Sequence, residues 1–272
     1  MILTCILSLS AVGSFLTCWS LPVRNAWLIL IFLGFFAAYA VALLFLYALF
    51  LLISSLLLPN KEYPPKKSRF AFWVIKHSCV LIRQISGARM AATGLENIPD
   101  EPYLLVANHR SNMDPILAIS ILKKRPIGFL TKAGNMKIPI VGPYVRRADF
   151  LTIDREHPLR AVRTIRDAAE LVKRDSISYG VYPEGTRNFT EETLLPFHDG
   201  VLMIAQKANL PVVVAVMQNS EQIAKRFPFR TTKIPFDILH VYSAEEVRNR
   251  RTTELSEEIR AMMLAHLEKA KA

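Results

Sequence analysis

The apolar and charged positions divide the chain into two parts near residue 60. Residues 26–58 carry no charged side chain over 33 positions, and a helix needs about 20 apolar residues to cross the hydrocarbon core of a bilayer. Since a helix rises about 1.5 Å per residue, this run would reach roughly 50 Å and would have to tilt, bend or protrude. It predicts a transmembrane helix; the alternative, a buried core helix, is seldom longer than about 20 residues.

Residues 1–21 are also apolar, and two interpretations stay open for them. A cleaved signal peptide usually begins with a positively charged segment, whereas "MILTCILSLS" has no lysine or arginine. We prefer a first transmembrane helix that turns at "LPVRN" into the second. Residues 1–59 are therefore predicted to form an N-terminal transmembrane region with one or two spans.

Residues 60–90 are predicted to form a basic linker and an amphipathic interfacial helix. Two prolines disfavour helix in "KEYPPKK", and residues 68–86 then place apolar side chains at helical spacing between basic ones. The same helix would also suit an ordinary protein core. Residues 61–69 hold four cations and one acid, so the positive-inside rule puts the following domain on the cytoplasmic face.

Short apolar runs and longer amphipathic segments alternate along residues 91–272, the predicted cytoplasmic domain. This alternation of strands with helices predicts a layered α/β fold. The predicted strands are 103–107, 127–131, 178–182, 211–216 and 236–242, and the predicted helices are 158–174 and 253–271. The first helix carries its apolar side chains on one face: Leu159, Val162, Ile165, Ala168, Ala169 and Val172.

The net charge of +11 calls for a negatively charged partner. Arg24 is the only charged residue before position 61, so 10 of these charges belong to residues 61–272. A membrane surface and a phosphorylated substrate fit this charge, and no zinc-finger, helix-turn-helix or RNA-binding pattern points to nucleic acid. The three cysteines form no CxxC or Cys/His cluster, which indicates neither a disulfide framework nor a metal site.

A histidine and an aspartate stand five positions apart in "NHRSNMDP", residues 108–115. A residue before proline avoids helical backbone, and proline favours the first helical position. We therefore expect Asp114 to be the N-cap of a helix and His109 to lie in the preceding turn. There the carboxylate can fix the tautomer of the imidazole and leave the other ring nitrogen free to take a proton from a hydroxyl. Alone, the spacing also fits a plain helix cap beside a loop histidine.

A second polar segment is "YGVYPEGTRN", residues 179–188. Gly185 permits close approach of the backbone to a ligand, and Arg187 offers permanently charged donors suited to phosphate. Alone, the segment also fits a charged surface turn.

Together, "NHRSNMD", then "YPEGTR" about 75 residues later, then "LPVVVAV" resemble the 1-acylglycerol-3-phosphate O-acyltransferases, a family of glycerolipid acyltransferases. The resemblance covers roughly residues 90–217. It implies an α/β acyltransferase domain with a mixed sheet, in which His109 is the general base and Asp114 orients it. It also implies no metal or bound cofactor, and an acyl donor that is acyl-CoA or acyl carrier protein. The implied acceptor-binding residues are Arg155, Glu184, Gly185, Thr186 and Arg187.

The family's second motif is altered in "DFLTIDR", residues 149–155, where Asp149 replaces a glycine and Thr152 a phenylalanine. The expected product is phosphatidic acid, made at the membrane from 1-acylglycerol-3-phosphate. The altered motif keeps other acceptors open: another lysophospholipid, glycerol-3-phosphate or an aminolipid. A non-catalytic lipid-binding protein is a further alternative, although it would have no use for a base. Residues 132–147, which mix apolar and basic side chains, either rest on lipid headgroups or pack on the sheet.

Overall fold

The computed structural model describes residues 2–21, 27–58, 67–153 and 157–270. The chain divides into two compact units, Met1–Pro59 and Asn60–Ala272. Residues 22–25 of the predicted turn "LPVRN" and residues 61–66 of the predicted linker lie outside the described residues.

The first unit consists of two apolar helices, α1 (Ile2–Ser20) and α2 (Trp27–Leu57). They cross at Gly13, where a Cβ atom would lie 3.2 Å from the ring of Tyr39, and Thr17 Oγ1 is 3.0 Å from the Tyr39 hydroxyl. Ser55 is the only buried residue of α2, so α2 is not the core helix of a globular domain. Both helices are long and apolar enough to cross a membrane.

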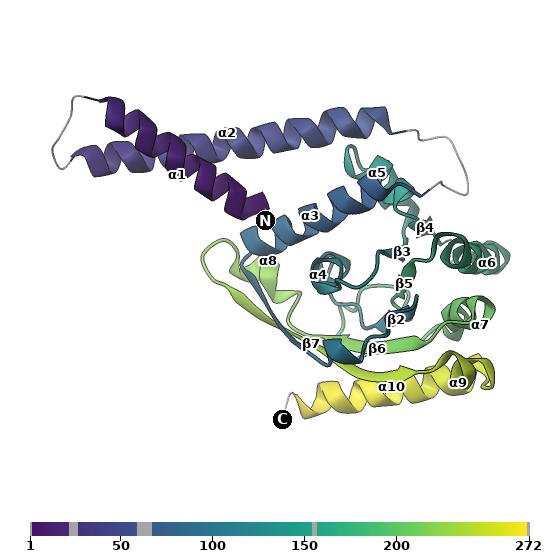
Figure 1. Ribbon diagram of the computed structural model, residues 1–272. Helices are drawn as coiled ribbons and strands as arrows, with labels where there is room; N and C mark the ends of the chain where they lie inside the picture. Colours follow the sequence, from purple (N-terminus) through teal and green to yellow (C-terminus); the bar gives the residue numbers. More distant parts are fainter. Residues whose placement is uncertain (1, 22–26, 59–66, 154–156, 271–272) are drawn as a thin grey trace. The chain divides into compact units, whose positions relative to one another are not determined.

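The second unit is built on a mixed sheet of seven described strands in the order β1-β7-β6-β2-β5-β3-β4. Strands β6 and β7 are antiparallel, and the other neighbours are parallel. The α/β class and the mixed sheet are thus confirmed (Figure 1). The strands are β1 (Ala88–Thr93), β2 (Leu104–Ala107), β3 (Ile127–Thr131), β4 (Leu151–Thr152), β5 (Ser178–Val181), β6 (Val212–Met217) and β7 (Thr232–Tyr242).

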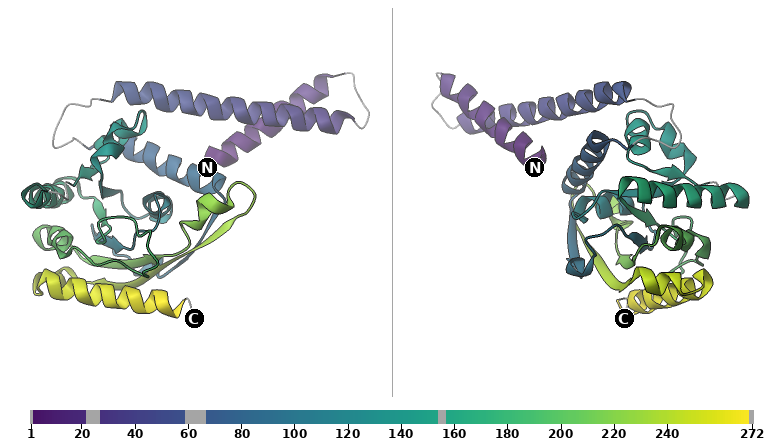
Figure 2. Two further views of the ribbon diagram at one scale, coloured as in Figure 1. Left: turned by 180° about the vertical axis from the view of Figure 1, so that it is seen from behind. Right: turned by 45° about the vertical axis from the view of Figure 1, so that its right-hand side comes forward.

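Helices cover both faces of this sheet (Figures 1 and 2). The α-helices are α3 (Arg69–Ile85), α4 (Met113–Ile121), α5 (Val141–Arg147), α6 (Pro158–Asp175), α7 (Met203–Ala208), α8 (Gln222–Arg226), α9 (Ala244–Arg248) and α10 (Thr252–Lys269). Three short 3₁₀ turns are η1 (Leu95–Asn97), η2 (Ala133–Lys137) and η3 (Asp199–Leu202).

The alternation of side chains along β2 shows how the two layers form. Leu104 and Val106 pack in one core with residues of α6, α7 and α10. Leu105 and Ala107 pack in the other core, with residues of α3 and α4. Because the central strands are buried on both faces, they are continuous apolar runs in the sequence, which is why the sequence located them.

All five predicted strands and both long predicted helices are present, with one packing error. On α6, Ile165, Ala168, Ala169 and Val172 are buried, but Leu159 is 87% exposed and Val162 is 51% exposed. The predicted apolar face is therefore wrong for its first turns, because only residues from Ile165 onward reach the core. The sequence also missed β1, whose "ARMAAT" is poor in β-branched residues, and the two-residue β4.

Helix α3 uses one side for the core and leaves the other open. Val74 and Leu81 are buried, whereas Phe70, Trp73 and Ile85 are 41–45% exposed. The apolar side chains predicted for this helix are thus divided between the core and exposed positions, so part of them fits each of the two alternatives.

Candidate active site

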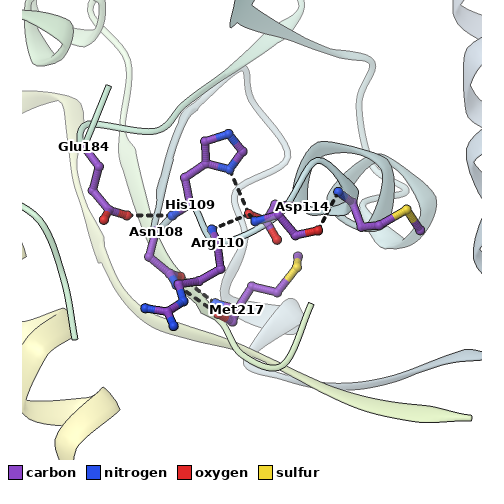
Figure 3. A network of polar contacts seen from close by, with 8 residues as sticks. Asn108, His109, Arg110, Asp114, Glu184 and Met217 are labelled. Carbon is purple, nitrogen blue, oxygen red and sulfur yellow. Dashed lines mark hydrogen bonds and ion pairs between the residues drawn. The ribbon is translucent and has the colours of Figure 1, made fainter. Parts of the chain in front are cut away.

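The turn that carries His109 lies at the carboxyl ends of parallel strands, the usual position of ligand sites in open α/β sheets. It begins at Asn108, directly after β2. Asn108 Nδ2 donates a hydrogen bond to the carbonyl of Met217 (2.9 Å), and the Met217 N–H donates to Asn108 Oδ1 (2.8 Å). This buried pair ties the end of β2 to the end of β6 and fixes the start of the turn (Figure 3).

The structure brings the side chains of His109 and Asp114 together. Asp114 Oδ2 is 2.8 Å from His109 Nδ1 and also accepts the backbone N–H groups of Arg110 (2.7 Å) and Ser111 (2.8 Å). The carboxylate is 1% exposed and the imidazole 17%. Within the described residues His109 Nε2 has no hydrogen-bond partner, so this nitrogen is available to a substrate hydroxyl.

The prediction that Asp114 caps a helix is wrong. Helix α4 begins at Met113, its N-cap is Asn112, and Asp114 is the second helical residue. Three hydrogen bonds to the Asp114 carboxylate hold this residue in place and outweigh the preference of a pre-proline residue for extended backbone. Pro115 is tolerated because N–H groups in the first turn have no partner within the helix.

Glu184 joins the His109 turn to the loop that follows β5. Its Oε1 accepts the backbone N–H of His109 (2.6 Å), and its Oε2 accepts that of Leu195 (3.1 Å). Burial raises the pKa of this carboxyl, and the two N–H donors oppose the shift. A direct contact with the acceptor would have to use lone pairs left over from these bonds, so the geometry gives Glu184 a positioning role.

Tyr182 supports the imidazole from one side. Its ring is stacked on that of His109, with centroids 4.2 Å apart and 14° between the planes, and it also stacks on Phe129 at 5.7 Å. The hydroxyl is buried and has no hydrogen-bond partner among the described residues. Burial, with the negative charge of Asp114, raises the pKa of Tyr182 well above its ordinary value.

Residues 89–218 match the model of the acyltransferase family. These 130 residues of the 272 thus resemble an acyltransferase domain. Among curated proteins, the chain is 28% identical to the 1-acyl-sn-glycerol-3-phosphate acyltransferase of Saccharomyces cerevisiae over 203 residues, which cover 73% of this chain and 66% of the yeast protein. It is 28% identical to the human 1-acyl-sn-glycerol-3-phosphate acyltransferase alpha over 139 residues, or 51% of this chain and 48% of that protein.

A solved structure supports the same relationship. The crystal structure of the 1-acyl-sn-glycerophosphate (LPA) acyltransferase PlsC from Thermotoga maritima matches with a TM-score of 0.61 and 26% identity, over 84% of this chain and 89% of that one. The chain spans only about half to two thirds of the length of the curated relatives named above.

The structure places the acceptor-binding residues implied by the sequence in different environments. Gly185 has a φ of +70°, a left-handed backbone that favours glycine. Thr186 is exposed, and the Arg187 guanidinium lies 4.7 Å from the ring centroid of the exposed Phe189. Arg155 lies outside the described residues.

The altered second motif, residues 149–155, begins at a strained position. Asp149 has a φ of +57°, which explains why a glycine suits this site. Its carboxyl is fully buried, 3.9 Å from the Arg174 guanidinium, and neither of its oxygens has a hydrogen-bond partner among the described residues. Burial and the neighbouring Asp175 carboxyl raise the pKa of Asp149 to about 7.

Asn108 and Tyr182 are the site residues that the sequence did not single out. Each stands at the end of an apolar strand and directly before or inside a recognised motif. The asparagine at the end of β2 could have been noticed in the sequence, because a buried polar side chain needs a hydrogen-bond partner. The stack of Tyr182 on His109 joins residues 73 positions apart, and no local pattern reports such a contact.

Proposed function

We propose that this acyltransferase moves a fatty acyl group from an acyl thioester to the sn-2 hydroxyl of 1-acylglycerol-3-phosphate and so makes phosphatidic acid. The hydrogen bond between His109 Nδ1 and Asp114 Oδ2 carries the proposal, because it leaves Nε2 available for a proton. The names of the yeast, human and Thermotoga relatives support this acceptor.

The pair acts as a general base in the proposed reaction. His109 Nε2 takes the proton of the acceptor hydroxyl while its oxygen attacks the thioester carbonyl carbon. The carbon–sulfur bond then breaks, and the leaving thiolate takes the proton back from the imidazolium. Asp114 holds the Nδ1–H tautomer and stabilises the positive charge of the ring. General-base catalysis typically increases the reaction rate about 10²–10⁴-fold. Positioning of the two substrates supplies the remaining rate enhancement.

We propose that Arg187 and Arg155 bind the phosphate of the acceptor. A guanidinium is always charged and can place two parallel N–H donors on one phosphate. In this structure Arg187 lies on the loop after β5, and Glu184 of the same loop is bonded to the His109 backbone. The loop between Arg187 and Glu184, together with the hydrogen bond from Glu184 to His109, would therefore position a bound acceptor relative to the base.

The proposed reaction takes place at a membrane. Two N-terminal helices are candidate spans, and the cations at positions 61–69 favour a cytoplasmic position for the domain that follows them. Both the acceptor and the product would then stay in the bilayer, while a water-soluble acyl thioester, acyl-CoA or acyl carrier protein, arrives from the cytoplasm.

A panel of acceptors tests this proposal. The purified full chain in detergent is given labelled acyl-CoA or labelled acyl carrier protein with 1-acylglycerol-3-phosphate, other lysophospholipids, glycerol-3-phosphate or an aminolipid. We expect kcat/KM for 1-acylglycerol-3-phosphate to exceed the others by about tenfold or more. A faster reaction with another acceptor would overturn the acceptor assignment alone. A folded protein that acylates none of them would overturn the enzymatic function.

A further inference from the structure

The segment between β6 and β7 ends in a projecting turn, residues 225–230, which we name the basic–aromatic tip. Its sequence is "KRFPFR". Phe229 is 93% exposed, the largest fraction among the large hydrophobic side chains of the described residues, and Phe227 is 49% exposed. Single exposed apolar residues are common, but two phenylalanines on one turn form a concentrated apolar contact.

The turn holds these rings outward. Ile223 of α8 is buried and accepts the N–H of Phe227 through its carbonyl (2.9 Å). The Arg230 N–H donates to the carbonyl of Arg226 (2.9 Å) and closes the turn around the two phenylalanines. These backbone hydrogen bonds order the turn that carries the two phenylalanines, so no binding partner is needed to order it.

The surroundings of the tip are strongly basic. From Glu221 to Asp237 the chain has no acid between these two positions and four cations: Lys225, Arg226, Arg230 and Lys233. Next to it, Arg89 of β1 is in register with Lys233 of β7. The positive charge therefore comes from two neighbouring strands as well as from the turn.

A hollow of about 480 Å³ opens on the same edge of the domain. Its lining includes Arg83, Gly87, Arg89 and Thr231, the last of which directly follows the tip. Arg83 Nε is buried there without a hydrogen-bond partner among the described residues. A hollow with two guanidinium groups suits the phosphate of a lipid headgroup.

We propose that the basic–aromatic tip is a site of contact with an anionic membrane. Phe227 and Phe229 enter the boundary between headgroups and acyl chains, the cations of the tip lie among the lipid phosphates, and the hollow beside it takes one headgroup. Apolar rings flanked by Lys and Arg are the composition that binds such interfaces. No part of this proposal depends on the reaction catalysed at His109.

A membrane fits this surface better than an acidic partner protein. Both share the negative charge, but a partner protein would have to offer a cavity for a ring that projects from the surface. A bilayer accepts a projecting ring without a preformed cavity. The two candidate spans of α1 and α2 also indicate that the chain is present at a bilayer.

Fluorescence quenching in the full-length protein tests the contact. Phe229→Trp adds an indole at the tip, and the emission that it adds to the wild-type background is measured in nanodiscs with brominated anionic lipids. We expect roughly half or more of this added emission to be quenched. The control is Glu268→Trp, at an exposed position on α10, on the opposite face of the sheet from α3 and α4 (Figure 2). Equal emission of Phe229→Trp in brominated and unbrominated lipids would overturn the proposal.

Two triple variants test whether contact with the membrane requires the positive charge of the tip. In the Phe229→Trp background, Lys225→Gln, Arg226→Gln and Arg230→Gln together should lower the quenching about twofold or more in anionic nanodiscs. The control triple variant removes three exposed cations outside the tip and should leave the quenching unchanged. Its substitutions are Arg248→Gln, Arg251→Gln and Lys269→Gln. Equal effects of the two triples would contradict a specific site.

An acidic carrier protein is the competing occupant. If apo acyl carrier protein shields the indole from iodide in detergent, and brominated lipids do not quench it, the tip binds that protein and the membrane assignment is wrong.

Discussion

The ring of Tyr182 is stacked on the imidazole of His109, with 4.2 Å between the two centroids and 14° between the planes. Asp114 fixes the edge of the same imidazole through Nδ1, so the ring is held in two directions while Nε2 stays open. The proposed general base needs this arrangement, since it must meet a hydroxyl at one fixed position.

Tyr182→Phe is expected to leave kcat within about twofold of the wild-type value. Its hydroxyl is buried without a hydrogen-bond partner among the described residues, so its loss should be neutral or should raise the free energy of unfolding by up to about 2 kcal/mol. Tyr182→Ala removes the stack and should lower both kcat and the free energy of unfolding, the latter by about 2–4 kcal/mol. Kinetics and urea unfolding of both variants measure these effects. A large loss of kcat in Tyr182→Phe would show that the hydroxyl, not the ring, matters.

His109→Ala should reduce kcat by about 10²–10⁴-fold and leave the fold intact. The turn is held through the backbone of His109, whose N–H donates to Glu184 and whose carbonyl accepts from Asn188, and alanine keeps both bonds. The measurement is kcat beside the thermal midpoint of unfolding. His240→Ala, at an exposed position, is the matched control and should be fully active. Retention of more than a few per cent of the rate by His109→Ala would contradict the role of the base.

Asp114→Asn should lower kcat strongly, by about 10²–10⁴-fold, with little change in KM for either substrate. An asparagine oxygen can still accept the N–H groups of Arg110 and Ser111, but it cannot offset the charge of the imidazolium. Asp114→Ala should in addition destabilise the domain, because buried donors lose their acceptor at a cost of about 1–3 kcal/mol each. If instead KM rises while kcat stays constant, Asp114 serves substrate binding.

Asp149→Asn should stabilise the protein at alkaline pH. Because the pKa of the Asp149 carboxyl is about 7 in the folded protein and about 3.9 in an unfolded chain, the folded state binds the proton more tightly. The contribution of this group to stability is fully present below about pH 4 and is lost as the pH rises to about 7. Asp175, Arg174 and Lys67 are the charged groups that act on it.

The asparagine carries no charge at any pH and is well suited to the left-handed backbone at this position. The gain in the free energy of unfolding at pH 8 should therefore be at most about 4 kcal/mol and should shrink below pH 7. Urea unfolding at several pH values measures it. Arg248→Gln is a control that should show no such dependence, and a gain that is constant with pH would contradict the assignment.

The strands and the long helices could be predicted because their patterns are local. The apolar run of β6 and the helical spacing of α6 stand in the sequence itself, and so does the pairing of His109 with Asp114, which needs only a turn of five residues. The three segments "NHRSNMD", "YPEGTR" and "LPVVVAV" also gave the resemblance to acyltransferases, because they combine particular residue types in a fixed order and spacing.

The sequence-based predictions fail where the burial or conformation of a residue depends on segments far away in the sequence. Leu159 and Val162 have the spacing of core residues, yet both side chains are exposed in the folded domain. Asp114 has the sequence of an N-cap, yet its three hydrogen bonds draw it into α4. The sequence also did not show that the Glu184 carboxylate accepts hydrogen bonds from the backbone of His109 and Leu195 and so links two loops.

The sequence by itself determined the apolar N-terminal helices, the alternation of strands with helices, and the pairing of His109 with Asp114. These are set by side-chain type and by spacing over a few residues. Only the tertiary structure decided which side of the imidazole is covered, which carboxylate holds the loops together and which apolar side chains remain exposed. Those outcomes depend on contacts between segments about 75 residues apart or more, since packing of the whole sheet fixes them and local spacing does not.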